Sequence, residues 1–543
     1  MKDKIKKMVG RLMGFINRKT QKTPRLRRLL IKINNNFTIV KNRNLMIYDT
    51  RKTTKKVVLK PFNQLKVAVI LDEFSYNSFK DDFECIVISP DNWEKTFKHE
   101  KPDIFLCESA WSGIDSEIRP WKGKIYSSVN FNSENRLVLF NILKYCRQNK
   151  IPTVFWNKED PSHYEDKVHN FADTAVKFDH VFTTAEECVE LYTRQYGHKS
   201  VHSLMFATNP KLFNPIKEYE RTNELIFAGS WYSYLEQRCI DIEKILDGAI
   251  EQNIDIVIYD RYYNYKDDEN HVWPEKYRKF IRPALEYTEI SKAYKGSNFA
   301  LNFTSVTESK TMFARRVFEL MSCRTCIVSN YSVGVEKLLG DNVIFAGENM
   351  ELVFDNKKIE ENLYSALREH TYKHRFRQIL EAIKYPYLDI KEDITLYYIM
   401  DKEEDFEEAI QIFERFTASN IKYTFLLSSN IENTAVKDLY QRYNSADVAV
   451  ISMDYYSKYD SFECNTKYFI FMDASNKIDC EFIEKSILHF SYINENTGIC
   501  RASDEAEKYT FKVISNAFNT LYSASKLPDI LADCNAEQKV YLI

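Results

Sequence analysis

Short apolar runs alternate with longer stretches of helical periodicity over residues 63–390. An apolar run too short for a helix is typical of a strand buried on both faces, and strands joined by helices pair in parallel. The alternation therefore predicts two consecutive α/β units, residues 63–218 and 219–390, each with a helix-covered parallel sheet. The predicted strands are 66–71, 85–89, 103–107, 153–156, 180–183 and 201–205 in the first unit and 224–228, 254–259, 299–303, 325–329 and 342–345 in the second; the clearest helices are 134–148, 185–196 and one that starts at Leu235.

Residues 391–543 repeat the pattern as a smaller α/β domain, with predicted strands at 394–400, 423–428, 448–453 and 468–472 and helices at 404–419 and 480–492. With 543 residues, of which 44% are hydrophobic, the chain can build several cores, which excludes global disorder. It has only 12 glycines, and none has the spacing of a Walker loop or a dinucleotide fingerprint. Those two chemistries are therefore disfavoured.

The charge is divided unevenly along the chain. Residues 1–60 hold 19 Lys and Arg against two acidic residues, whereas the whole chain has a net charge of −2, so the remainder carries −19. Apolar residues at helical spacing make residues 2–19 an amphipathic basic helix. We therefore expect residues 1–62 to be a basic arm, and residues 1–34 to bind an anionic membrane surface.

Two other interpretations of the arm remain open. It packs on its own domain with a solvated basic face, or it binds a polyanion such as nucleic acid. The acidic body has no basic groove beyond residue 60, so no nucleic-acid partner is expected. No apolar run reaches the 18 residues of a membrane span, and the N-terminus lacks the apolar core of a secretory signal.

The eleven cysteines are scattered, and their only C-x-x-C pair is Cys323–Cys326. No second pair of cysteines or histidines follows at zinc spacing. The pattern favours a reduced protein of the cytoplasm without a zinc site.

Polar residues gather where the strands of the first unit are predicted to end, and ligands of parallel sheets bind at such carboxyl ends. Glu108 opens a polar segment after the third strand, and residues 156–164 follow the fourth. The latter segment carries Glu159, Asp160 and His163, a set suited to acid–base catalysis or to binding hydroxyls. The alternative is a solvated loop in which Ser162 is a helix N-cap.

The second unit shows two comparable features. A strand, the turn Gly229-Ser230 and a helix that bears Arg238 form a pattern typical of anion binding. A dense polar segment then follows the third strand, and its candidate ligand-binding side chains are Asn302, Ser309, Lys310 and Thr311.

Arg316 and Glu319 follow on one face of the next predicted helix, three residues apart. A guanidinium neutralises a leaving diphosphate, and a carboxylate accepts hydrogen bonds from two ribose hydroxyls. The alternative is an exposed ion pair worth about 0.3–0.5 kcal/mol.

These features occur in a specific order. The segments are Phe155-Trp156-Asn157-Lys158-Glu159-Asp160-Pro161, residues 178–184, residues 227–230 with Arg238, residues 311–319 ending in Arg316-Val317-Phe318-Glu319, and residues 329–336. In this order and spacing they resemble the CgeB or spore-maturation-type glycosyltransferases of the GT-B fold. The resemblance covers residues 63–385, about 60% of the chain.

The resemblance implies an α/β protein with two Rossmann-like domains facing a cleft, the second of which holds a nucleotide-sugar donor. Related GT-B enzymes contact the donor with a Glu-x7-Glu pair. Glu319 matches the second glutamate and would hold the ribose, whereas Thr311 replaces the first, a departure that sets this chain apart from the retaining relatives. Arg238 and Arg316 would lie near the diphosphate, and Ser332 and Gly334 would belong to a loop that offers N–H groups to phosphate.

The resemblance also implies that no bound metal or other cofactor is needed, because cations and helix ends take that role. Residues 359–384 would form closing helices that return toward the first domain. On the acceptor side, Glu108, Glu159, Asp160 and His163 are the candidates for contacting the acceptor hydroxyl or acting as base.

The order of elements in residues 391–543 resembles a shortened GT-A glycosyltransferase domain. Residues 469–475 fall where that fold carries its metal-binding Asp-x-Asp, but the second position is Ser475. One carboxylate holds a divalent ion poorly. We therefore expect a degenerate module that binds acceptor, a partner or a second copy of the chain; the alternative is an ordinary small α/β domain.

Together these features predict a glycosyltransferase that moves a sugar from a nucleotide donor to a hydroxyl of a cell-envelope polymer or glycan at the cytoplasmic membrane face. UDP is expected from the habit of the family. The predicted catalytic residues are Glu159, Asp160, His163 and Arg316. The alternative is a non-catalytic GT-B-like scaffold that binds or regulates a partner enzyme, which Thr311 and Ser475 favour.

Overall fold

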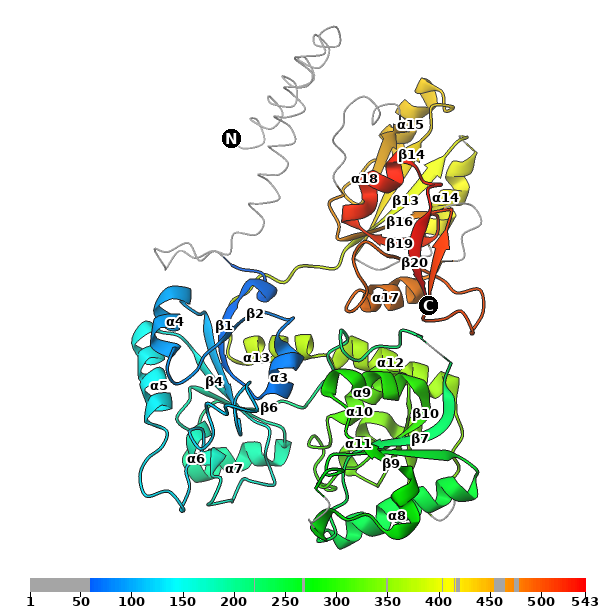
Figure 1. The fold of residues 1–543 in the computed structure, drawn as a ribbon. Helices are drawn as coiled ribbons and strands as arrows, with labels where there is room; N and C mark the ends of the chain where they lie inside the picture. The colour runs from blue at the N-terminus through cyan, green and yellow to red at the C-terminus, as the bar shows by residue number, and fades with distance from the viewer. Residues whose placement is uncertain are drawn as a thin grey trace. The chain divides into compact units, whose positions relative to one another are not determined.

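The computed structural model describes residues 59–543, except 219, 266–268, 348–349, 403, 415, 417–419, 454–463 and 473–477. The helices and strands described below all belong to one compact unit, Lys60–Ile543 (Figure 1). Residues 1–58 of the predicted basic arm, and Asp473 and Ser475 of the predicted Asp-x-Asp remnant, lie outside the described residues.

The first domain is built on six parallel strands in the order β2-β1-β3-β4-β5-β6. Its elements are η1 (Phe62–Gln64), β1 (Lys66–Ile70), α3 (Glu73–Phe79), β2 (Glu84–Val87), α4 (Trp93–Glu100), β3 (Ile104–Glu108), α5 (Leu137–Asn149), β4 (Thr153–Asn157), α6 (Phe171–Ala175), β5 (His180–Thr183), α7 (Glu186–Tyr196) and β6 (Val201–Ser203). Alternate side chains enter different cores: Ala68 and Phe105 pack with α4 to α7, whereas Val67 and Leu106 pack with α3. Burial on both faces explains the near-continuous apolar strands.

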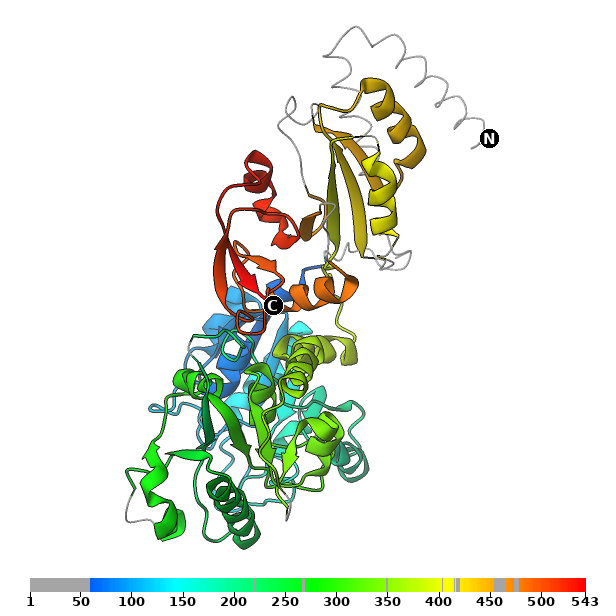
Figure 2. The ribbon, with the colours of Figure 1, turned by 90° about the vertical axis from the view of Figure 1, so that its right-hand side faces the viewer.

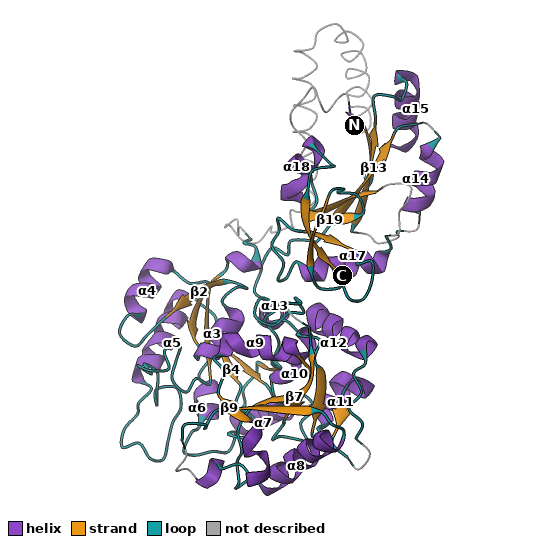
Figure 3. Ribbon diagram, turned by 45° about the vertical axis from the view of Figure 1, so that its right-hand side comes forward, coloured by secondary structure: helices purple, strands orange, loops and turns teal. Residues whose placement is uncertain are grey.

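The second domain has six parallel strands in the order β12-β11-β10-β7-β8-β9. Its elements are β7 (Thr222–Ala228), α8 (Glu236–Glu251), β8 (Asp255–Asp260), η2 (Glu269–His271), η3 (Glu275–Phe280), β9 (Ile281–Pro283), α9 (Tyr287–Gly296), β10 (Ser297–Asn302), α10 (Arg316–Ser322), β11 (Cys326–Ser329), α11 (Val333–Leu339), η4 (Gly340–Asn342), β12 (Ile344–Phe345) and α12 (Asn356–Glu369). Leu225 and Leu301 pack with α8, whereas Ile226 and Ala300 pack with α10 and α11. Figure 3 shows the strands of both sheets in orange among the purple helices.

Helix α13 (Tyr372–Ala382) follows the second domain in sequence but packs in the first. Phe376 and Leu380 lie in the same buried core as Val67 and Leu106. Arg375 is also buried, and its guanidinium donates hydrogen bonds to the Met205 and Phe206 carbonyls, which offset the cost of burying the charge. The chain therefore returns to the first domain, as the resemblance implies.

The third sheet, drawn in yellow to red in Figure 2, is mixed. Its strand order is β15-β14-β13-β16-β19-β17-β20-β18. Its elements are β13 (Ile394–Met400), α14 (Asp405–Phe413), β14 (Ile421–Leu427), α15 (Asn433–Tyr443), β15 (Val448–Ser452), β16 (Tyr468–Met472), α17 (Cys480–His489), β17 (Gly498–Cys500), β18 (Phe511–Ile514), β19 (Thr520–Ser523), η5 (Ala524–Lys526), α18 (Leu527–Ala532) and β20 (Gln538–Leu542). The first four strands are parallel and match the predicted ones. The last four strands were not predicted, because they are short and pair through contacts distant in sequence.

The predicted α/β class with Rossmann-like domains is confirmed by the two parallel sheets and their covering helices. All eleven cysteines are free thiols. In the part of the chain that the structure describes, no helix has the length and apolar character required to cross a bilayer.

Candidate functional site

The strand order of the second sheet reverses direction between β7 and β10, since β8 and β9 continue on one side and β11 and β12 on the other. Ligands of such sheets bind outside the carboxyl ends of the strands at this switch point. Gly229 and Ser230 come directly after β7, and Asn302 is the last residue of β10. The predicted ligand-binding turn and the start of the polar segment therefore lie at the expected edge.

Two arginines approach the end of β7. The Arg238 Nη2 donates to the Ser230 carbonyl at 3.0 Å, and the guanidinium lies over the Tyr232 and Phe303 rings, 4.9 and 4.7 Å from their centroids. The Arg316 Nε donates to the Tyr294 hydroxyl at 3.1 Å, and its Nη2 donates to the Ala228 carbonyl. Neither guanidinium pairs with a carboxylate among the described residues.

The two guanidiniums also affect each other. Burial, together with the positive charge of Arg316, lowers the pKa of Arg238. Two cations held close together without a counter-ion favour the binding of an anion. This edge of the sheet is therefore suited to a phosphate or diphosphate group.

Four buried polar atoms along the same edge make no hydrogen bond in the structure. They are Ser230 Oγ, Arg238 Nε, Asn302 Oδ1 and Ser332 Oγ. Buried polar atoms in folded proteins nearly always have a partner. Donors and acceptors left unpaired beside two arginines fit a ligand that carries hydroxyls as well as phosphate.

Glu319 is 4% exposed. Its ion-pair partner is Arg315, not the Arg316 of the alternative interpretation. Its Oε1 accepts a hydrogen bond from the Nε of Arg315 at 3.0 Å, whereas Arg316 turns toward β7. The physical reason is helical geometry, because positions 315 and 319 are four residues apart and share a face. Sequence reasoning overlooked Arg315, although this spacing was visible in the sequence.

Arg315 also contacts the first domain. Its guanidinium lies over the ring of Phe74 on α3, 3.6 Å from the centroid, and 5.6 Å from that of Tyr287. Cation–π contacts of this kind contribute about 0.5–2 kcal/mol. The side chain that holds the Glu319 carboxylate is therefore itself held by both domains.

The predicted donor ligands of residues 309–311 contact the start of α7 instead. The Thr311 hydroxyl donates to the Thr184 carbonyl and accepts from the Glu186 N–H, both at 2.8 Å. The Ser309 hydroxyl donates to the Glu187 carboxylate at 3.1 Å. The Lys310 Nζ lies 3.6 Å from the Glu186 carboxylate. The free N–H groups and carboxylates at the helix start are the reason for these contacts. The three side chains join the two domains in this structure, and their predicted role in donor binding stays a prediction.

Gly334 is required for packing. A Cβ there would lie 2.8 Å from the Ser309 carbonyl oxygen and 2.7 Å from the Phe313 ring, so only glycine fits without movement. The preceding N–H, that of Val333, donates to the Thr307 carbonyl at 2.9 Å. The Val333 N–H is therefore not available to a phosphate in this structure, and the predicted phosphate-binding role of Ser332 and Gly334 stays a prediction.

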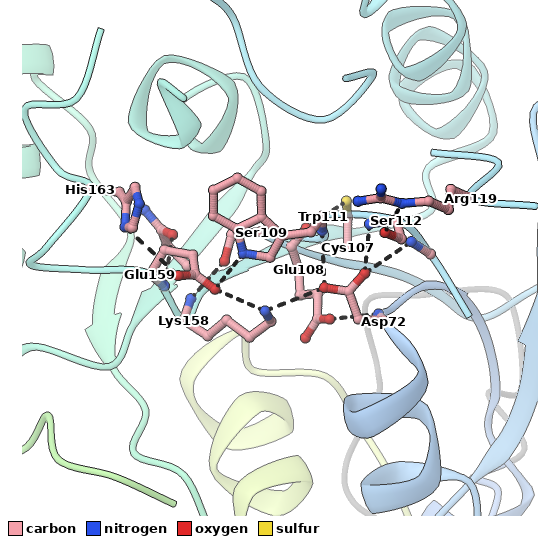
Figure 4. A network of polar contacts seen from close by, with 12 residues as sticks. Asp72, Cys107, Glu108, Ser109, Trp111, Ser112, Arg119, Lys158, Glu159 and His163 are labelled. Atoms are coloured by element: carbon pink, nitrogen blue, oxygen red, sulfur yellow. Dashed lines mark hydrogen bonds and ion pairs between the residues drawn. The ribbon is translucent and has the colours of Figure 1, made fainter. Parts of the chain in front are cut away.

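The first domain gathers a second polar cluster at the ends of β1, β3 and β4 (Figure 4). The carboxylate of Asp72, next to the end of β1, accepts hydrogen bonds from the backbone N–H groups of Trp111, Ser112 and Gly113, each at 2.9 Å. Asp72 was not among the predicted residues. Its place directly after a predicted strand was the available signal.

Lys158 and Glu159 meet this cluster from the end of β4. The Lys158 Nζ lies 2.9 Å from Glu159 Oε1 and 3.4 Å from Asp72 Oδ2, and the Trp111 Nε1 donates to Glu159 Oε1 at 2.9 Å. Burial would lower the pKa of Lys158, but the Glu108, Glu159 and Asp72 carboxylates raise it. The amine therefore stays charged and orients the carboxylate of Glu159.

Glu108 is fully buried at the end of β3. Its Oε1 accepts from the Asp72 N–H at 2.6 Å, and its Oε2 has no hydrogen-bond partner. Burial raises the pKa of Glu108 to about 7, although nearby Lys158 opposes the shift. A carboxyl whose pKa lies near neutral, and whose charge interacts with the Lys158 amine that orients Glu159, is suited to acid–base work. His163 is the third candidate for acid–base work, and its Nδ1 lies 3.7 Å from Glu159 Oε2.

Asp160 is bound on all sides within the first domain. The side chain is fully buried, and its oxygens accept hydrogen bonds from Asn157 at 2.7 Å, Thr183 at 2.7 Å and Tyr192 at 3.1 Å. All three donors lie within the first domain, so the carboxylate ties β4, β5 and α7 together. The structure therefore shows a stabilising role for this side chain, and its predicted catalytic role stays a prediction.

Burial raises the pKa of Asp160 to about 7. Because the folded state then holds a proton that the unfolded state releases, stability should fall as pH rises from about 4 to 7. Asp160→Asn is expected to remove up to about 1.4 kcal/mol per pH unit of this slope. Urea denaturation at several pH values tests it, with exposed Glu117→Gln as the control. An unchanged slope in Asp160→Asn would show that this carboxyl does not titrate in that range.

A comparison with family models adds one finding. Residues 243–381 match a family model described as glycosyl transferase-like. The match includes Arg316 and Glu319 and ends within α13. A search of curated proteins finds no match.

Solved structures give several matches. A sucrose-phosphate synthase from Thermosynechococcus elongatus is 9% identical with a TM-score of 0.35, covering 54% of this chain and 76% of its own. An alpha-glucosyltransferase in complex with UDP is 10% identical with a TM-score of 0.40. The match covers 59% of this chain and 100% of that one. A glycosyltransferase from Rickettsia africae is 11% identical with a TM-score of 0.37. The match covers 60% of this chain and 98% of that one.

Proposed function

We propose that the protein is a glycosyltransferase whose second domain holds a nucleotide-sugar donor at the ends of β7 and β10. The observation that carries the proposal is the pair of guanidiniums, Arg238 and Arg316, which lack a carboxylate partner among the described residues beside unpaired buried polar atoms. The glycosyl transferase-like family match over residues 243–381 supports it. The arginines would stabilise the leaving diphosphate, so no metal is needed at this point.

On the acceptor side, we place Glu159 as the base, with His163 and Glu108 beside it. The acceptor oxygen would form a bond to the anomeric carbon while the bond from that carbon to the diphosphate oxygen breaks. The acceptor proton would pass to the carboxylate that Lys158 and Trp111 orient. Glu319, held by Arg315, would accept hydrogen bonds from the ribose of the donor.

The identity of the substrates is a further part of the proposal. We propose a UDP-linked hexose as donor and a cell-envelope polymer or glycan as acceptor, at the cytoplasmic membrane face. The support for the membrane is the charge of +17 in residues 1–60. Vesicle flotation tests it: the full chain should float with anionic vesicles only, and a chain without residues 1–34 should not. Residues 391–543 are proposed to bind acceptor, a partner or a second copy.

A nucleotide-release assay tests the reaction. The full chain is incubated with a panel of UDP-, GDP-, ADP- and CDP-sugars, and the released nucleotide is measured. We expect release from one donor without acceptor, because water replaces the acceptor hydroxyl slowly. No release together with no donor-induced rise in Tm would contradict the enzyme and favour the non-catalytic scaffold.

A further inference from the structure

The loop between β4 and α6 brings together two imidazoles and a carboxylate. One ligand atom each of His163, Asp166 and His169 lies within 4.8 Å of the other two. The loop is folded by its own backbone, since the His163 N–H donates to the Glu159 carbonyl and the Asp166 N–H to the His163 carbonyl. The three side chains are only partly exposed, between 26% and 34%.

We propose that His163, Asp166 and His169 bind a divalent transition-metal ion, with zinc as the best fit. Imidazole nitrogen suits zinc and other late transition metals, whereas magnesium and calcium prefer a shell of oxygens. Three protein ligands leave one position of a tetrahedral ion open for water or another ligand.

The distances allow an ion with little movement. The Nδ1 of His169 lies 3.0 Å from the Oδ2 of Asp166. Two ligands each about 2.0–2.1 Å from an ion in tetrahedral geometry are about 3.3 Å apart. The ligand atom of the third residue, His163, lies at most 4.8 Å from each of the other two.

The His163 ring is not committed to another partner. Its Nδ1 is buried and makes no hydrogen bond, and the nearest carboxylate oxygen, of Glu159, lies 3.7 Å away. A buried imidazole nitrogen without a partner is unusual, and an ion bound at this nitrogen would satisfy it.

The surroundings of the three ligands are aromatic. The Trp111 ring packs against both imidazoles, with centroids 5.5 Å from His163 and 5.0 Å from His169, and Tyr126 packs against His169 at 5.1 Å. Aromatic neighbours limit the access of water and hold the imidazoles in place. Since Trp111 also donates to Glu159, an ion here would stiffen the loop that carries the proposed base. Metal binding itself does not depend on the proposed sugar transfer.

Cobalt binding tests the site in the full chain, produced without a histidine tag and stripped with a chelator. We expect one equivalent of Co²⁺ to bind with visible d–d absorption and to be displaced by Zn²⁺ but not by Mg²⁺ or Ca²⁺. His163→Ala and His169→Ala should each weaken binding at least 10-fold. His99→Ala, which changes a histidine with an 82% exposed side chain outside the cluster, is the matched control and should bind as the parent does.

Asp166→Asn distinguishes a loss of metal binding from a loss of folded structure, because asparagine keeps the shape of the side chain but not its charge. It should weaken Co²⁺ binding while the far-UV circular dichroism spectrum stays that of the parent. The proposal is overturned if the parent gives no saturable Co²⁺ spectrum. It is equally overturned if all three ligand variants bind Co²⁺ as the parent does.

Discussion

Arg316→Ala is expected to lower the rate of nucleotide-sugar turnover by about 10²–10³-fold. The guanidinium lies beside the end of β7, where no carboxylate pairs with it among the described residues, so its charge is available to a leaving diphosphate. Charge that develops during bond breaking is stabilised most by such a fixed cation. The loss should therefore appear mainly in kcat, measured as released nucleotide with the donor that the panel identifies.

Two further arginines sharpen this test. Arg238→Ala should cause a loss of similar size, because its unpaired Nε lies among the same buried polar atoms. Arg278→Ala removes an exposed arginine of the same domain, paired with Glu275, and should keep parental activity. Arg316→Lys keeps the charge but loses the two-point contact with Tyr294 and Ala228, so an intermediate rate is expected. Parental turnover in Arg316→Ala and Arg238→Ala would place the donor elsewhere.

Phe376→Ala is expected to destabilise the protein by about 3–5 kcal/mol. The side chain is 1% exposed and lies in the first domain's core, where its ring centroid is 4.4 Å from that of Phe83. Removing it leaves a cavity between α13 and the sheet, so the helix that returns from the second domain should loosen. Urea denaturation followed by tryptophan fluorescence measures the change.

The matched control lies two residues further along the same helix. Gln378 is exposed, so Gln378→Ala should change the free energy of unfolding by less than about 0.5 kcal/mol. Equal, small changes in both variants would mean that α13 does not contribute to the first domain's core in solution.

The two candidate clusters are held in different ways. In the first domain, Asp72 organises the backbone after β3, and Lys158 and Trp111 orient Glu159, so hydrogen bonds between strand-end loops set the geometry. In the second domain, the arginines rest on carbonyls and aromatic rings and keep their charge uncompensated by carboxylates among the described residues. The first arrangement suits proton transfer, and the second suits binding of an anion.

In residues 63–390, the sequence by itself determined the edge of each sheet where polar residues gather and all strands except β9. A strand buried on both faces needs a short apolar run, and the residue after it leaves the core, so strand positions and strand-end clusters are local properties of the chain. For that reason Ser230, Asn302 and Glu159 could be placed at sheet edges from the sequence. The spacing of residues 315 and 319 was also local, and it was overlooked.

Only the tertiary structure decided which partner each polar side chain has. Thr311 contacts the start of α7, Asp160 accepts hydrogen bonds from β4, β5 and α7, and α13 packs in the core of the first domain. Asp72 finds its donors about 40 residues later in the chain. These contacts join segments far apart in sequence, and burial depends on the whole fold. No local sequence pattern predicts these contacts or this burial, because both arise when loops from different strands come together at one edge of a sheet.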